Sequence, residues 1–128
     1  MYLLDTNACL DFLLARNAAI VPRIERAFGK LSISAITTAE LRVGNRASTD
    51  PEKDARNVDA FLTVVSIAPF DGAAAGIYGQ IARTMGVQRS SFDRLIAAHA
   101  LALDLTLVTN NECDFADVPG LRVENWTR

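Results

Sequence analysis

The chain has 128 residues, of which 50% are apolar and 22% are charged, with a formal net charge of −2. This length and composition fit one globular domain, residues 1–128, and exclude a disordered chain. No apolar run approaches the roughly 18 residues of a membrane span. The N-terminal apolar stretch is interrupted by Asp5 and has no basic region before it. We therefore expect no signal peptide, no membrane contact and a cytoplasmic location.

Short strand-like runs alternate with helical patterns along the chain. In the first half of the chain we expect a strand at 2–4, helices at 8–14 and 19–28, a strand at 31–34 and helices at 35–46 and 51–62. In the second half we expect a strand at 64–67, a helix capped by Asp71 that runs to residue 85, and a helix at 91–103. A fourth strand is expected at 106–108 and a fifth at 121–123. Strands separated by helices imply right-handed crossovers. The pattern therefore predicts an α/β fold with a parallel sheet of four to five strands and helices on both faces.

Four acidic residues are expected at one edge of this sheet. Asp5 ends the first strand, and Asp114 lies just beyond the fourth. Glu40 lies about one turn into the helix that leaves the second strand. Asp93 begins the helix that runs back to the fourth strand. Because ligands of such sheets bind at the carboxyl ends of the strands, we expect the four carboxylates to converge there.

Each acid also has an ordinary structural interpretation. Asp5 can cap the first helix, and Asp114 can be a turn residue. The segments 37–40 and 90–93 both match a capping box. Taken together these interpretations are weaker, since four uncompensated carboxylates in one place would repel each other and some would stay protonated. A bound divalent cation removes that penalty.

The chemistry of these ligands points to a particular kind of ion and reaction. Hard oxygen ligands without a His or Cys cluster favour Mg²⁺, with Mn²⁺ as a substitute, over zinc. Cys9 and Cys113 form no metal-binding pattern. A net negative charge does not exclude a nucleic-acid substrate, because cations held by carboxylates face the phosphate. The expected reaction is hydrolysis of a phosphodiester by metal-activated water.

Four segments, in this order and spacing, resemble the motifs of a known family. They are Leu3–Asn7, Ile33–Gly44, Phe92–Leu101 and the closing segment Leu107–Trp126. Together they resemble the PIN domain, and within it the VapC family, the ribonuclease toxins of bacterial type II toxin–antitoxin systems. The resemblance covers essentially the whole chain. It implies a PIN-like three-layer α/β/α sandwich and a Mg²⁺-dependent endoribonuclease. It also implies a homodimer that is neutralised by a VapB-type antitoxin occupying the acidic site.

The resemblance also implies roles for individual residues. By matching position, Asp5 and Asp93 would be the main metal ligands, and Glu40 a further ligand or a water-positioning acid. For the fourth acid the nearest carboxylates are Glu112 and Asp114, and Asp114 is favoured because its place before Phe115 matches the acidic-Phe step of related toxins. Many PIN domains carry an Asp where this chain has Asn111. Asn111 is therefore a candidate neutral ligand that acts directly or through water.

Several other polar residues are candidates for supporting roles. Thr6 and Thr109 are expected to orient carboxylates by hydrogen bonding. Among the arginines, Arg89 is the best candidate for RNA contact, because it lies in the loop just before Asp93. His99 is interpreted as a buried helix histidine rather than a general base.

The sequence also bears on three other classes of protein. A phosphatase that forms an aspartyl-phosphate is disfavoured because Asn7 stands where such enzymes need a second Asp. A dinucleotide-binding domain is disfavoured because no glycine-rich fingerprint follows the first strand. A non-catalytic Mg²⁺-binding module, or a PIN domain that has lost its activity, remains an alternative. The presence of Asp5, Glu40 and Asp93 argues against it.

Overall fold

The computed structural model describes residues 1–128 and has a five-stranded, all-parallel sheet at its centre. The strands are β1 (Tyr2–Leu4), β2 (Leu31–Ser34), β3 (Ser66–Ala68), β4 (Thr106–Val108) and β5 (Val123–Glu124), and they lie in the order β3-β2-β1-β4-β5. The central strand β1 pairs with β2 on one side and β4 on the other, so that Leu4 lies beside Ile33 and Val108. The carboxyl ends of these three strands therefore meet at one edge.

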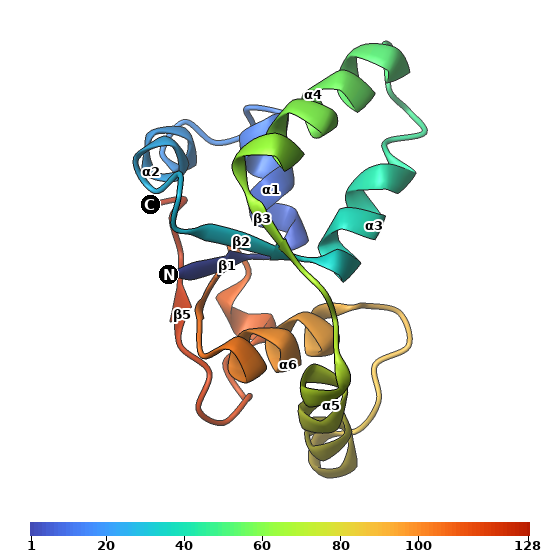
Figure 1. Ribbon diagram of the computed structural model, residues 1–128, viewed down its shortest axis with the longest axis vertical. Coiled ribbons are helices and arrows are strands. Elements are labelled where there is room, and N and C mark those ends of the chain that lie inside the picture. Colours follow the sequence, from blue (N-terminus) through green and yellow to red (C-terminus); the bar gives the residue numbers. More distant parts are fainter.

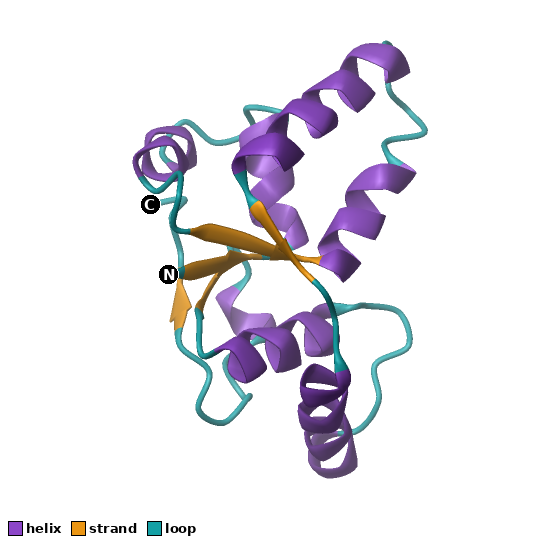
Figure 2. Ribbon diagram, in the orientation of Figure 1, coloured by secondary structure: helices purple, strands orange, loops and turns teal.

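Six α-helices cover the two faces of the sheet. They are α1 (Thr6–Leu13), α2 (Ile20–Arg26), α3 (Ala35–Val43), α4 (Pro51–Val64), α5 (Gly72–Met85) and α6 (Asp93–Leu103), and a short 3₁₀ helix, η1, spans Glu112–Asp114. Figure 1 shows α1 to α4 above the sheet and α5 and α6 below it. The strands form the middle layer between them (Figure 2). The predicted α/β fold with three layers is confirmed. None of the helices is both long and apolar enough to cross a membrane.

Alternating side chains of the central strands divide the interior into two cores. Leu4 and Val108 belong to the core under α1, α2 and α4, whereas Leu3 and Leu107 belong to the core over α5 and α6. All four are fully buried. Because both faces of the sheet are covered, its central strands are apolar on both sides, as expected for a parallel sheet. This packing fixes the strand ends that carry the polar residues of the carboxyl edge.

The elements lie where the sequence predicted, with differences at their ends. The helix expected at 35–46 stops at Val43, because Gly44 has a φ of 76° that breaks the helical backbone. The first helix starts at Thr6, two residues earlier than expected, because Asp5 caps it. The strand expected at 64–67 begins only at Ser66, since α4 continues to Val64. The last strand is Val123–Glu124, shifted by two residues from the expected start.

His99 is buried, as predicted, at 1% exposure. Its Nδ1 lies 2.8 Å from Oγ of Ser34, at the junction of β2 and α3. Burial lowers the pKa of its imidazole, and the Pro69 carbonyl and the charge of Asp71 oppose that shift. The neutral ring therefore ties α6 to the end of β2. Cys9 is buried, Cys113 is exposed, and both are free thiols.

Candidate active site

Asp5 lies at the carboxyl end of β1 and caps α1. Its Oδ1 accepts a hydrogen bond of 2.7 Å from the backbone N–H of Ala8. Its own backbone N–H donates to the carbonyl of Val108 at 3.0 Å, which extends the pairing of β1 with β4 by one residue. The capping interpretation is therefore correct, and it does not exclude a chemical role. The cap holds the carboxylate in one orientation at the carboxyl edge.

The surroundings of Asp5 disfavour its charged form. Burial raises the pKa of this carboxyl group from 3.8 to about 6, and the charges of Asp93 and Asp11 add to the shift. Hydrogen bonds from the Thr109 side chain and the Ala8 amide act in the opposite direction. A pKa this far above its ordinary value is typical of functional carboxylates, and a bound cation would reverse the shift.

Glu40 on α3 is held by a hydrogen bond from α1. The hydroxyl of Thr6, in the first turn of α1, lies 2.6 Å from Oε1 of Glu40 on α3. The buried Thr37 hydroxyl lies 3.2 Å from that of Thr6. Since Thr6 has one hydroxyl hydrogen, donation to the carboxylate leaves its oxygen to accept from Thr37. The expected capping box at 37–40 is wrong, because Ser34 caps α3 and accepts from the amide of Ile36.

Asp93 is the first residue of α6. Its backbone N–H donates to Oγ of Ser91 at 3.0 Å. The expected capping box at 90–93 is wrong, because the N-cap residue of α6 is Phe92 and no side chain caps the helix. Burial raises the pKa of the Asp93 carboxyl group, and Asp114 raises it further through its charge and a side-chain hydrogen bond. The side chain of Ser91 opposes the shift. Asp93 and Asp114 are thus direct neighbours.

Three of the four predicted acids line one pocket of about 340 Å³, which we call the acidic pocket. Its wall combines the carboxylates with polar residues of α1 and of the loop before α6. The lining residues are Asp5, Thr6, Asn7, Leu10, Glu40, Arg89, Ser90, Ser91, Phe92 and Asp93. Arg89 therefore lies beside the acids, as expected for a residue that would meet a phosphate. The sequence argument that these acids meet at one edge is supported by this geometry.

The fourth acid lies outside the acidic pocket. Asp114 is exposed on η1, where its carboxylate accepts a hydrogen bond from the side-chain amide of Asn111. The backbone N–H of Asn111 donates to Oγ1 of Thr109 at 3.0 Å, and Thr109 in turn binds Asp5. The segment after β4 therefore reaches the site through Thr109 and through the contact of Asp114 with Asp93.

Sequence reasoning missed one buried acid near this site. Asp11 lies on α1, is 7% exposed and accepts a hydrogen bond of 2.5 Å from the side-chain amide of Asn110. It also forms an ion pair of 3.2 Å with Arg16. Asp11 thereby ties α1 to the loop that carries Thr109 and Asn111. In the sequence, Asp11 is recognisable as an acidic residue inside the otherwise apolar helical segment 8–14.

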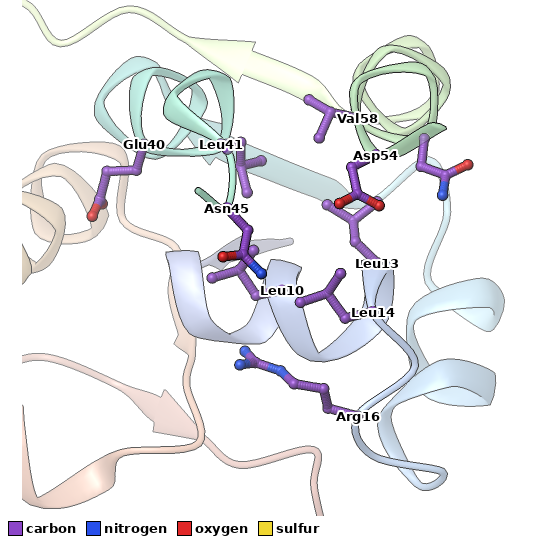
Figure 3. A pocket seen from close by; sticks show the side chains of 11 residues that line it. Leu10, Leu13, Leu14, Arg16, Glu40, Leu41, Asn45, Asp54 and Val58 are labelled. Atoms are coloured by element: carbon purple, nitrogen blue, oxygen red, sulfur yellow. The ribbon is translucent and has the colours of Figure 1, made fainter. Parts of the chain in front are cut away.

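A second, more apolar pocket adjoins the acidic one. It measures about 380 Å³ and shares Leu10 and Glu40 with the acidic pocket. Figure 3 shows Leu10 of α1, and Leu14 just after it, on the side of Leu41 of α3 and Val58 of α4, with Glu40 at one end. Apolar surface thus runs from the acidic pocket along α1, between α3 and α4.

The donor set of the acidic pocket fits a hard divalent cation. All of its charged donors are carboxylates, and two of them have raised pKa values because burial and neighbouring negative charge disfavour ionisation. Oε1 of Glu40 is already bound to Thr6, whereas no hydrogen bond engages Oε2. No three acidic, His or Cys side chains lie close enough to enclose an ion by themselves. The residues therefore offer a partial set of ligands that water and substrate oxygens would complete.

Comparison with known proteins identifies the family. The profile of the PIN domain matches residues 2–121. The chain is 35% identical to the tRNA(fMet)-specific endonuclease VapC of Shigella flexneri over 98% of each chain. It is 32% identical to ribonuclease VapC2 of Rickettsia felis, over 100% of this chain and 99% of the relative.

Solved structures show the same relationship. A structure of DNA-bound VapBC from Salmonella typhimurium contains a chain with a TM-score of 0.86 and 32% identity, over 98% of this chain and 97% of that one. VapBC2 of Rickettsia felis, bound to a promoter DNA fragment, gives a TM-score of 0.85 at 32% identity, over 98% of both chains. The chain therefore belongs to the PIN-domain family and, within it, to the VapC ribonucleases.

Proposed function

We propose that this protein is the toxin of a type II toxin–antitoxin system, an endoribonuclease that hydrolyses RNA phosphodiester bonds. The observation that carries the proposal is the acidic pocket, in which Asp5, Glu40 and Asp93 come together from separate elements at the carboxyl edge. Arg89 lines the same pocket, where it can meet a substrate phosphate. Residues 1–128 would act as one nuclease domain.

PIN-domain nucleases generally depend on a divalent metal. In this protein we propose Mg²⁺, with Mn²⁺ as a substitute, held by Asp5 and Asp93 and completed by Glu40 and Asp114. When bound, such an ion lowers the pKa of a coordinated water and neutralises charge on the phosphate.

The chain's own residues prepare this chemistry by fixing the carboxylates. The Ala8 amide and the Thr109 side chain orient Asp5. Thr6 fixes Oε1 of Glu40 and leaves Oε2 to accept a hydrogen bond from a water or to bind the ion. Such supporting groups typically change metal affinity or activity by about 10- to 100-fold when they are removed.

The proposed partners follow from the relatives. Solved neighbours are VapBC complexes, and we propose that a VapB-type antitoxin inhibits this chain by covering the acidic pocket. The adjoining apolar pocket along α1 offers such a partner a surface to bury. We also propose a homodimer as the active toxin. The expected place of action is the cytoplasm, because the toxin would meet RNA and the antitoxin there.

The first RNA to test is an initiator tRNA. Relatives from Shigella flexneri and Salmonella typhimurium are named tRNA(fMet)-specific endonucleases, at 35% and 33% identity. The experiment incubates the purified chain with an initiator-tRNA transcript and with total RNA, in Mg²⁺ and in EDTA. Cleavage that requires the ion supports the proposal. Binding of Mg²⁺ without cleavage of any RNA would instead favour a non-catalytic binding module.

A further inference from the structure

Phe92 is an exposed aromatic side chain in the wall of the acidic pocket. It is 50% exposed, precedes Asp93 directly and lines the pocket together with Arg89. Its backbone begins α6, since the Phe92 carbonyl accepts from the Ile96 amide at 3.0 Å, but half of its side chain stays exposed.

The ring is not needed by either hydrophobic core. Neither core includes Phe92, even among the partly buried residues packed against it. The other exposed phenylalanine, Phe28, packs edge-on against Phe12 with ring centroids 6.2 Å apart. Phe92 has no such aromatic partner in the chain. Its π-face is therefore available to a ligand.

The composition of the pocket indicates which ligand would cover this ring. Only Phe92 and Leu10 are apolar among the lining residues, and the rest are acidic, basic or polar. An apolar protein segment would find little to bury here. A nucleotide matches the wall better, because its base can stack on the ring while its phosphate faces Arg89 and the carboxylate site.

We propose that Phe92 stacks on an unpaired nucleobase next to the phosphodiester that is cut. This inference rests on the proposed ribonuclease function and adds to it the requirement that the RNA is unpaired where it is cut. A base inside a duplex is already stacked on its neighbours and cannot offer its face to a side chain. The substrate is therefore single-stranded at the cleavage point.

The test separates the aromatic ring of Phe92 from its apolar character. Phe92→Leu keeps an apolar side chain and removes the ring, Phe92→Tyr keeps the ring, and Val87→Ala is the control. Val87 is 56% exposed in the same connection between α5 and α6 but does not line the acidic pocket. Steady-state cleavage is measured on the initiator-tRNA transcript, or on whichever RNA the wild type cuts in total RNA.

We expect Phe92→Leu to raise KM by about 5- to 100-fold, the range that corresponds to loss of one stacked base, with kcat within about threefold of wild type. Phe92→Tyr and Val87→Ala should leave KM nearly unchanged. An abasic nucleotide beside the mapped cleavage site should weaken cleavage by the wild type and have little further effect on Phe92→Leu.

A Phe92→Leu protein that cleaves with the KM of wild type would overturn the inference while leaving the ribonuclease function intact. If binding of that variant to a co-expressed antitoxin is also weakened, the ring belongs to that partner instead. If the wild type cuts no RNA at all, the proposed function fails and this inference fails with it.

Discussion

Thr6 and Glu40 are joined by a hydrogen bond of 2.6 Å that links the first turn of α1 to α3. The two residues are 34 positions apart in the sequence, and the contact brings the exits of β1 and β2 together. It fixes the carboxylate of Glu40 on one oxygen, next to the capped carboxylate of Asp5. Hydrogen bonds to charged acceptors are shorter and stronger than neutral ones, so this contact orients an acid of the pocket.

Removing the Thr6 hydroxyl should therefore impair catalysis more than folding. We expect Thr6→Val, which keeps the shape of the side chain, to lower kcat/KM for RNA cleavage by about 10- to 100-fold. Thr84→Val is the matched control, because the hydroxyl of Thr84 contacts only carbonyls within α5. Equal kinetics for Thr6→Val and wild type would show that Glu40 needs no positioning.

Asp5 should make the metal-free protein less stable as the pH rises. Its pKa is about 6 in the folded state and near 3.8 in an unfolded chain, so the folded protein binds more protons between these values. The free energy of unfolding then falls as pH rises through about 4 to 6, by at most about 3 kcal/mol. Asp5→Asn should remove this dependence and stabilise the protein at pH 8 in EDTA.

Denaturant unfolding at pH 4 and pH 8 measures this effect. Asn remains a good helix cap, so the substitution preserves the local structure of α1. Asp50→Asn is the control, because Asp50 is an exposed cap of α4 that accepts from the Lys53 amide at 3.1 Å. If Asp5→Asn, but not Asp50→Asn, lowered the free energy of unfolding at pH 8, the assignment of an unfavourable buried charge to Asp5 would be contradicted.

The same pKa predicts how metal binding depends on pH. A cation binds the ionised carboxylate and must displace its proton, so affinity should rise as pH increases through about 6 and level off above 7. The raised pKa of Asp93 acts in the same direction. Titration calorimetry with Mn²⁺ between pH 5 and 8 checks this expectation, and a pH-independent affinity would contradict it.

Ser34 should contribute to stability through two contacts. Its Oγ accepts from the Ile36 amide at 3.1 Å and lies 2.8 Å from Nδ1 of the buried His99. We expect Ser34→Ala to reduce the free energy of unfolding by about 1–3 kcal/mol, because it removes a helix cap and a partner of a buried polar group. Ser32→Ala in the same strand should change it by less than about 0.5 kcal/mol. Similar values for the two variants would contradict this role.

Much of the fold could be predicted because hydrophobic patterns and turn residues agree along the chain. Leu31–Ser34 and Thr106–Val108 are strands within their predicted bounds, since these short segments are flanked by helix starts or turns. Element ends were less predictable. Whether α4 stops at residue 62 or 64 depends on packing against its neighbours, which no local pattern encodes.

The site was predictable where topology alone decides the position of a residue. Asp5 follows a strand end and Asp93 begins a helix at the carboxyl edge, and Glu40 reaches the same pocket from inside α3, the helix that leaves β2. The places of Asp11 and Asp114 depend on side-chain contacts with Asn110 and Asn111 in an irregular loop. Such contacts between distant segments leave no periodic signal in the sequence.

RNA cleavage is proposed to take place in the acidic pocket. The most direct test of this proposal is cleavage by wild type and Asp93→Asn protein, each shown to be folded by circular dichroism, in Mg²⁺ and in EDTA. Asp104→Asn, an exposed residue at the far end of α6, is the control. We predict cleavage by wild type and Asp104→Asn in Mg²⁺ alone, and a loss of at least about 100-fold for Asp93→Asn. Folded Asp93→Asn protein that cuts RNA as fast as wild type would contradict the account.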